Sequence, residues 1–281
     1  STLFPYTTLF RSTNRDIHEN SGSLQRILAE ARKTNGGYDD IWLLGDILGH
    51  ADRISGKDAF DSDVPAVIAL IENETSEAVF GNWEYWLTHP EDDRVNPAQE
   101  KYLDQLQGLR AGLNGTLTQV LEKLSMKSMV TVTKETPEFT LFHGCTFRLY
   151  NGDGHTAAPW ESYLYPKELN RVTRGLFENT ANLTTDHFLF GHTHMPGYFV
   201  YSMRTLTNAW MQFTENWLGV VFPYRNGVQR FGINPGSVGE RRAGLPRTAL
   251  IVDQERATFE YVADPKSLCG GRNGARAFGG I

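Results

Sequence analysis

Residues 187–194, HFLFGHTH, join an apolar run of strand length to a glycine and two histidines. His192 and His194 are two residues apart, so in extended backbone both side chains point to the same side. In α/β proteins, ligands gather outside the carboxyl ends of the strands. This stretch therefore predicts a buried strand that ends in two candidate metal ligands.

Four further motifs extend this pattern in both directions along the chain. Three of them follow apolar runs at 41–44, 78–80 and 139–142, so at least four of the five motifs come directly after an expected strand. Carboxylate, amide and imidazole groups without a thiolate favour Mn, Fe, Zn or Ni over a closed structural zinc site, and seven ligands are too many for one ion. We therefore expect two divalent metal ions. The candidate ligands are Asp16, His18, Asp46, Asn82, His143, His192 and His194.

The ordered series DxH, GD, GN, H and GHTH, followed by NPGSVG at 234–239, resembles the calcineurin-like metallophosphoesterase superfamily, and its small bacterial and archaeal phosphodiesterase branch in particular. The resemblance runs from about residue 16 to residue 262. It implies an α/β fold, a two-sheet β-sandwich flanked by helices in αββα order. It also implies a metal-dependent phosphoric ester hydrolase, most simply a phosphodiesterase.

The resemblance further implies how the two ions are held. One would be bound by Asp16, His18, Asp46 and His194, and the other by Asp46, Asn82, His143 and His192, with Asp46 bridging. Such ions lie roughly 3.5–4 Å apart, and the hydroxide that they share attacks phosphorus in line. Asp46, Asn82 and His143 are the predicted catalytic residues. Manganese is the favoured metal, with iron, zinc and nickel as alternatives.

Three residues near the motifs need separate interpretation. Many relatives have histidine after the GN asparagine, near the leaving-group oxygen, but this chain has Trp83, whose indole N–H cannot be released as a proton. The residue that would protonate the leaving group is therefore undefined. The expected substrates are phosphodiesters and esters with good leaving groups rather than unactivated monoesters. Glu19 stands where relatives commonly have glycine, and we expect it to point to solvent. Glu84 is expected to be a helix-start charge rather than a ligand.

Composition limits the classes of partner. A net charge of −6 with no basic cluster does not indicate a nucleic-acid groove, and no apolar run approaches the roughly 20 residues of a membrane span. Two cysteines, Cys145 and Cys269, make no disulfide framework, which predicts a reducing, cytoplasmic location. Cys145 is expected to be a small buried residue. The expected substrate is a small-molecule or phosphoprotein phosphate ester, and the oligomeric state stays open.

The two ends of the chain are expected to lie outside the folded domain. Residues 2–12 read TLFPYTTLFRS, similar to a sequencing-library adapter translated in frame, so residues 1–12 are interpreted as an artefact. The next residues, 11–15, are polar where a central apolar strand is expected. Either residues 7–10 fill that strand position or the strand is damaged. The predicted domain covers residues 13–266, and residues 267–281 form an irregular tail.

Between the motifs, the chain alternates helices and strands. Helices are expected at 21–33, begun by Ser21 or Ser23, and at 64–74, 97–109 and 113–124. A strand pair is expected at 130–132 and 139–142 around a turn at 135–137. The second sheet is expected to contain 197–221 and 228–233, closed by 248–252 and 257–262. Residues 145–166 form either one wall of the substrate cleft or a surface loop.

Two alternatives to a phosphodiesterase remain. One is a protein-binding scaffold of the same fold with weak or no hydrolysis, and the other is a phosphoprotein phosphatase. A scaffold would be free to lose metal ligands, whereas all seven positions are filled here, which favours an enzyme. His50, His89 and His155 do not belong to any of the five motifs, and we expect them to lie outside the site.

Overall fold

The computed structural model describes residues 10–14, 16–34, 37–49, 63–89, 100–113, 117–124, 126–134, 138–148, 158–224, 227–240 and 244–268. His50, His155 and Cys269 lie outside the described residues, as do the turn expected at 135–137 and most of the two predicted terminal segments, at 1–9 and 269–281.

The strands of the described part of the chain form two sheets. The strands are β1 (Phe10–Asn14), β2 (Asp40–Leu43), β3 (Thr75–Val79), β4 (Met126–Ser128), β5 (Val130–Val132), β6 (Phe139–Phe142), β7 (His187–Phe190), β8 (Gly197–Ser202), β9 (Thr207–Gln212), β10 (Val221–Pro223), β11 (Gln229–Asn234), β12 (Thr248–Asp253) and β13 (Thr258–Ala263). One sheet has the order β10-β13-β12-β1-β2-β3-β4, and the other β5-β6-β7-β11-β8-β9. The expected pairing of 130–132 with 139–142 is confirmed.

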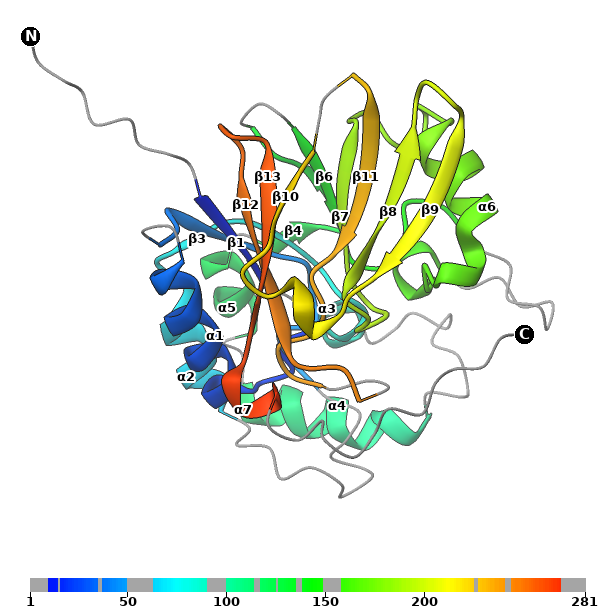
Figure 1. Cartoon of the computed structure of the whole chain (residues 1–281). Helices are drawn as coiled ribbons and strands as arrows, with labels where there is room; N and C mark the ends of the chain where they lie inside the picture. The colour runs from blue at the N-terminus through cyan, green and yellow to red at the C-terminus, as the bar shows by residue number, and fades with distance from the viewer. Residues whose placement is uncertain are drawn as a thin grey trace, which may run out of the picture.

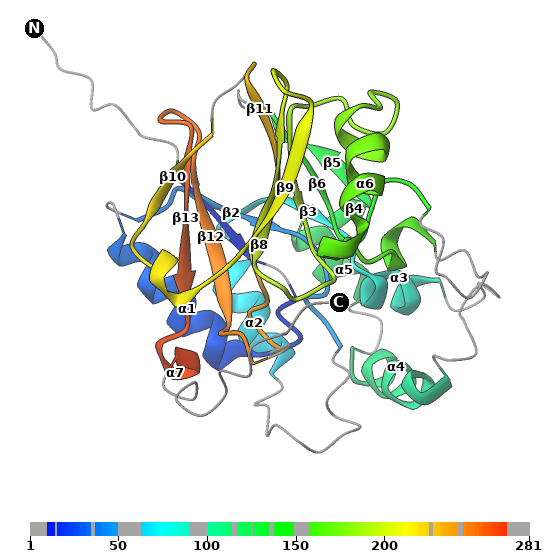
Figure 2. The ribbon, with the colours of Figure 1, turned by 45° about the vertical axis from the view of Figure 1, so that its right-hand side comes forward.

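The helices of the described part are α1 (Ser21–Lys33), α2 (Val64–Ile71), α3 (Asn82–Thr88), α4 (Glu100–Leu113), α5 (Leu117–Lys123), α6 (Leu169–Val172) and α7 (Pro265–Leu268). Helices α1, α2 and α5 pack on the outer face of the seven-stranded sheet, and α6 packs on that of the other sheet. In two views, α1 and α6 lie on opposite sides of the molecule with the sheets between them (Figures 1 and 2). The predicted αββα architecture is confirmed. No helix among the described residues is long and apolar enough to cross a membrane.

Several expected helix ends are wrong by a few residues. The helix expected over 64–74 stops at residue 71, the helix expected to stop at 109 continues to 113, and the next begins at 117. The start of α1 is also different. Asn20 caps it, because its side-chain oxygen accepts a hydrogen bond from the Ser23 N–H at 2.9 Å.

Alternation along the strands produces three apolar layers. In β2 and the residue after it, Ile41 and Leu43 pack with helices α1 and α2, whereas Trp42 and Leu44 pack against the second sheet. In β7 the alternation is repeated, with outward phenylalanines packed against the segment around α6. Both faces of these strands are therefore buried, which explains why their sequences are continuous apolar runs.

The expectation that residues 248–252 and 257–262 close the second sheet is wrong. β12 and β13 are in the seven-stranded sheet, where β12 lies between β13 and β1. Every residue of β12 is buried: Ala249 and Ile251 pack with the helices, and Leu250 and Val252 pack between the sheets. A strand that is apolar on both faces suits a central position, and β12 has such a position between β13 and β1.

The polar residues before Asp16 do form a strand, contrary to expectation. β1 pairs antiparallel with β12 and parallel with β2, and Thr13 lies opposite Leu250 on one side and Trp42 on the other. Two neighbouring strands offer hydrogen-bonding partners to both backbone edges of β1. Because buried backbone groups must be paired, the ladder favours a strand here even without apolar side chains.

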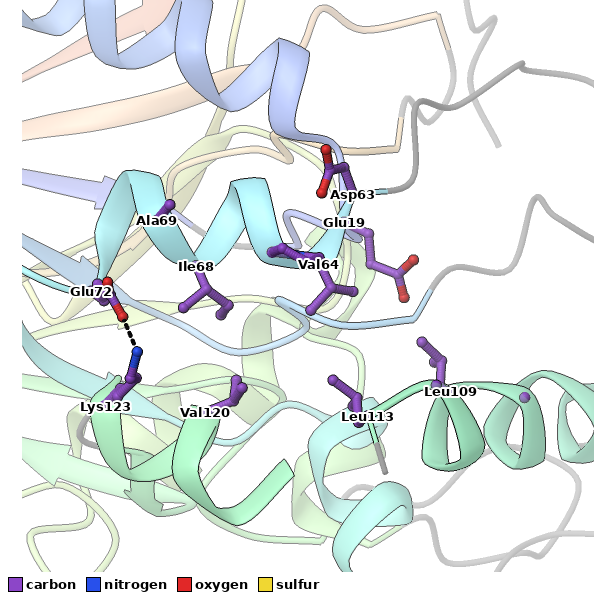
Figure 3. A pocket seen from close by; sticks show the side chains of 13 residues that line it. Glu19, Asp63, Val64, Ile68, Ala69, Glu72, Leu109, Leu113, Val120 and Lys123 are labelled. Carbon is purple, nitrogen blue, oxygen red and sulfur yellow. Dashed lines mark hydrogen bonds and ion pairs between the residues drawn. The ribbon is translucent and has the colours of Figure 1, made fainter. Parts of the chain in front are cut away.

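A cavity of about 590 Å³ lies between α2 on one side and α4 and α5 on the other (Figure 3). Its walls are mainly apolar, with Ile68 and Val64 facing Val120 and Leu113. An ion pair between Glu72 and Lys123, 2.6 Å long, closes one end.

Candidate metal centre

Strands from both sheets bring the seven candidate residues together. β1, β2 and β3 are parallel neighbours, as are β6, β7 and β11, so the carboxyl ends of each set meet at one edge. Asp16, Asp46 and Asn82 follow the first set, and His143 and His192 follow the second. All seven side chains lie at this edge and are buried, each at most 6% exposed.

The first group of acceptors consists of Asp16, His18 and His194. One ligand atom from each lies within 4.8 Å of the others. The Nε2 atoms of His18 and His194 are 3.4 Å apart, and His194 Nε2 is 3.5 Å from Asp16 Oδ1. This group could hold a metal ion.

The second group consists of Asp46, His143 and His192, with Asn82 beside it. His143 Nε2 lies 3.1 Å from Asp46 Oδ2, and it is equally far from His192 Nδ1 and Asn82 Oδ1. The two groups adjoin, since His143 Nδ1 is 3.9 Å from Asp16 Oδ1. Two candidate metal positions therefore lie side by side.

The backbone between His192 and His194 is not extended. Their φ angles are +69° and +55°, so the reasoning that both would point to one side is wrong. The chain turns instead, and the two side chains enter different groups. His194 lies with Asp16 and His18, and His192 lies with Asp46 and His143.

Left-handed backbone is concentrated at the site. Among the described non-glycine residues with positive φ, five are candidate ligands and one is Glu19. Such conformations cost of order 1–3 kcal/mol each and persist only where surrounding contacts impose them. The strained positions therefore indicate that the loops are shaped for the side chains they present. The five ligands are Asp16, His18, Asp46, His192 and His194.

The hydrogen bonds of the imidazoles test whether a cation fits. His18 Nδ1 is 2.6 Å from the Gly49 carbonyl oxygen, and His143 Nδ1 is 2.7 Å from that of Leu44. A carbonyl only accepts, so both Nδ1 atoms carry protons and each neutral ring presents its Nε2 lone pair to the site. Lone pairs and carboxylate oxygens that converge at about 3 Å repel one another unless a cation lies among them. The residues present therefore fit a pair of divalent metals.

Two glycines let the ligand loops touch. A Cβ on Gly45 would lie 2.4 Å from the Gly81 nitrogen, and a Cβ on Gly81 would lie 2.1 Å from Asp46 Oδ1. Gly45 also has a φ of +85°. The glycine of each GD and GN motif is thus required by close approach of the β2 and β3 loops.

Glu84 links the same two loops by hydrogen bonds to the backbone of each, a role that was not expected from the sequence. It lies in the first turn of α3 as expected, but it is fully buried. Its Oε2 accepts hydrogen bonds from the N–H groups of Asp46 and Gly81, and its Oε1 accepts from Ile47 and Leu48, all at 2.8–2.9 Å. The signal was a glutamate at the third helix position after a glycine, which is the position of a capping box.

Glu19 does not point to solvent, so that expectation is wrong. It is 1% exposed, and its Oε1 accepts a hydrogen bond from the Gly49 N–H at 2.8 Å. The Gly49 carbonyl in turn accepts from His18. Glu19 therefore holds the loop that orients a candidate ligand, a role that depends on residues about 30 positions away.

The NPGSVG segment at 234–239 forms hydrogen bonds with two loops that carry ligands of the first group, the loop of Asp16 and the loop of His194. Asn234 donates a hydrogen bond to Thr193 Oγ1 at 2.7 Å, between the two histidines of GHTH. Ser237 Oγ and the Gly239 N–H both donate to the Asp16 carbonyl, at 3.0 and 2.8 Å. The turn after β11 thus fixes the backbone of both ligand loops.

The described part of the 145–166 segment lies against the second group. Tyr163 stacks on His192 with ring centroids 3.9 Å apart, and the Glu161 carbonyl oxygen lies 3.2 Å from His192 Nε2. Tyr165 stacks on Tyr163 in turn, at 5.2 Å. The described part of this segment therefore contacts the site through Glu161 and Tyr163.

Trp83 and Cys145 are core residues. Trp83 is 4% exposed and packs edge-on against Trp86 in an apolar cluster with α4. Cys145 is a buried free thiol whose pKa is raised to about 12 by burial, as expected for a small core residue. His89 is exposed and stacks on Tyr85, which places it outside the site as predicted.

The electrostatic environment of the imidazoles is strongly negative. Burial lowers the pKa of His143, but the Asp46 and Asp16 carboxylates outweigh burial and raise this pKa to about 9. Burial also lowers the pKa of His18, but the carboxylates of Glu240, Asp46 and Asp16 outweigh burial and leave this pKa raised. In metal-free protein, the nearby carboxylates therefore favour the protonated forms of His143 and His18.

The chain is similar to known proteins in sequence and in fold. Residues 15–257 match the model of the calcineurin-like phosphoesterase superfamily domain. Among solved structures, the chain is similar to a metallophosphoesterase from Sphaerobacter thermophilus at 21% identity and a TM-score of 0.63, covering 92% of this chain and 88% of that one. A phosphoesterase from E. coli is similar at 16% identity and a TM-score of 0.41, covering 91% and 99%. No curated protein matches the chain significantly.

Glu84→Gln is expected to destabilise the protein by roughly 2–4 kcal/mol, although the two side chains have the same shape. An amide has one acceptor oxygen, so its NH₂ group would face two backbone N–H donors. Urea unfolding followed by circular dichroism measures this loss. Glu30→Gln, on the exposed face of α1, is the matched control and should change stability by less than about 0.5 kcal/mol. Equal small effects in both variants would contradict this role for Glu84.

Metal-free protein is expected to lose stability as pH rises from 6.5 to about 9. The folded pKa of His143 lies above its unfolded value of 6.5, so its stabilising effect is complete below pH 6.5 and is lost as pH passes about 9. The loss is on the order of 3 kcal/mol. Chelator-treated protein and its His143→Gln variant should be unfolded in urea across this range. A wild-type pH dependence that the variant fully retains would assign it to other groups.

Proposed function

Because the chain belongs to the calcineurin-like phosphoesterase superfamily, we propose that this metal-dependent phosphoric ester hydrolase is a phosphodiesterase that uses two divalent ions. The observation that carries the proposal is the convergence of buried acceptor atoms at two adjoining points. Burying such a set of like-charged and lone-pair groups without a cation is costly. A metal pair is the occupant that their number and chemistry favour.

In this proposal each group holds one ion. Asp16, His18 and His194 hold the first, and His143 and His192 hold the second together with Asp46 and Asn82. Asp46 is shared between them. Its Oδ1 accepts a hydrogen bond from the Trp83 N–H at 3.0 Å, while its Oδ2 faces His143. Mixed oxygen and nitrogen donors without sulfur suit manganese, with iron, zinc and nickel as alternatives.

When bound, the ions activate a water molecule and neutralise charge on the phosphoryl group during in-line displacement. The protein's own residues supply position. The Asn82 Oδ1 atom faces His143, which leaves its amide N–H groups to donate to a phosphoryl oxygen. Asp46, held through its backbone N–H by Glu84, keeps its carboxylate aimed into the site. No side-chain nucleophile is required.

Two features support a diester rather than an unactivated monoester. Trp83 is buried in an apolar cluster, and its indole cannot serve as an acid for the leaving group. A diester also carries a second ester group that needs a surface. Tyr163, stacked on His192, offers an aromatic one next to the second group.

Metal analysis and Asp46→Asn test the metal proposal together. Protein purified without chelator should contain close to two equivalents of transition metal, and Mn²⁺ should raise the melting temperature of the chelated protein. Asp46→Asn should lose at least about 10²-fold in hydrolysis, because the carboxylate shared by both ions becomes a weaker ligand. His89→Ala, at the surface, is the control and should keep full activity. Less than half an equivalent of metal, with no thermal shift, would refute the proposal.

The leaving group should control the rate. Bis(4-nitrophenyl) phosphate should be cleaved much faster than alkyl diesters, and phosphoserine peptides should be poor substrates, because Trp83 cannot supply a proton to the departing oxygen. General acid catalysis is worth roughly 10²–10⁴-fold where it operates, so the slope against leaving-group pKa should be steep. A slope near zero would show that some group does protonate the leaving oxygen. Efficient hydrolysis of phosphoserine peptides would favour a phosphoprotein phosphatase, and no hydrolysis of any ester would favour a scaffold.

A further inference from the structure

The four imidazoles of the site are not held alike. Three of them direct the ring nitrogen that faces away from the candidate metal position to a backbone carbonyl. These contacts join His18 Nδ1 to Gly49, His143 Nδ1 to Leu44 and His192 Nε2 to Glu161, at 2.6, 2.7 and 3.2 Å.

The fourth imidazole faces a carboxylate. His194 Nδ1 lies 3.6 Å from Glu240 Oε2, which is ion-pair range, and both side chains are buried. Glu240 lies behind the ring, on the nitrogen opposite the Nε2 atom that faces Asp16 and His18. Glu240 therefore contacts His194 at Nδ1, and its negative charge also acts on the neighbouring His18.

The position of Glu240 is set by the same turn that holds Asp16. The Glu240 N–H donates a hydrogen bond to Ser237 Oγ at 3.0 Å, and Ser237 Oγ donates to the Asp16 carbonyl. The carboxylate is thus carried on a segment that is hydrogen-bonded to another candidate ligand of the same group.

From this difference we infer that Glu240 is a positioning residue that selectively strengthens metal binding by Asp16, His18 and His194. A carboxylate next to Nδ1 keeps the proton on that nitrogen, orients the ring and makes Nε2 a stronger donor. A carbonyl does the first two but carries no net charge. The two metal positions therefore differ in affinity through one buried carboxylate. This inference rests on the proposed two-metal function.

Stepwise binding of Mn²⁺ to chelator-treated protein, followed by isothermal titration calorimetry, is the test. Glu240→Gln should weaken metal binding at one of the two positions by about 10- to 100-fold, the usual effect of losing an outer partner of a metal-binding histidine. The dissociation constant at the other position should change by less than about threefold. Glu260→Gln, which removes a half-buried carboxylate from β13, is the control and should change neither constant.

Combining Glu240→Gln with a substitution in one ligand group shows which metal position Glu240 affects. In His192→Ala, which impairs the second group, Glu240→Gln should still weaken Mn²⁺ binding. In His194→Ala, which removes the ring that Glu240 contacts, Glu240→Gln should change Mn²⁺ binding by less than about threefold. Equal weakening of both constants, no weakening, or a larger effect in the His194→Ala background would overturn the inference. Wild-type protein that does not bind two ions would instead refute the proposed function.

Discussion

The mutual repulsion of acceptor atoms that converge at two adjoining points is the constraint on which this structure depends. Imidazole lone pairs and carboxylate oxygens lie about 3 Å apart in a buried region, and only a cation relieves their repulsion. In metal-free protein a proton on His143 serves the same purpose, because Asp46 and Asp16 raise the pKa of this histidine. The surrounding protein must therefore hold the acceptors in place against their own repulsion.

Three kinds of support share this task. The sheets are rigid because both faces of their central strands are buried in apolar layers. The ligand loops that follow these strands contain residues in the left-handed conformation, and the β2 and β3 loops touch at Gly45 and Gly81. Buried hydrogen bonds then tie one loop to the next, through Glu84 between the β2 and β3 loops and through the turn after β11 around Asp16. Strain in the loops is thus balanced by contacts that lie beneath them.

The supports also make the two positions chemically distinct. The first group is backed by the Glu240 carboxylate and by the loop that Glu19 holds, whereas the second is backed by carbonyl oxygens and by the Tyr163 ring. The Tyr163 ring therefore lies at one group only, and the buried Glu240 carboxylate supports the other from behind.

Much of the fold and the identity of the candidate residues followed from the sequence alone. Apolar runs that end in Asp46, Asn82, His143 and GHTH predict strands that end at a common site, because strand periodicity and residue chemistry are local properties. The tertiary structure alone decided the partners. It placed β12 beside β1, sent His192 and His194 to different groups, and buried Glu19 and Glu84 against backbone N–H groups about 30 to 40 positions away. Spacing along the chain predicts a shared face only where the backbone is regular. At this site the backbone turns through left-handed conformations, so the direction of each side chain depends on contacts from distant segments.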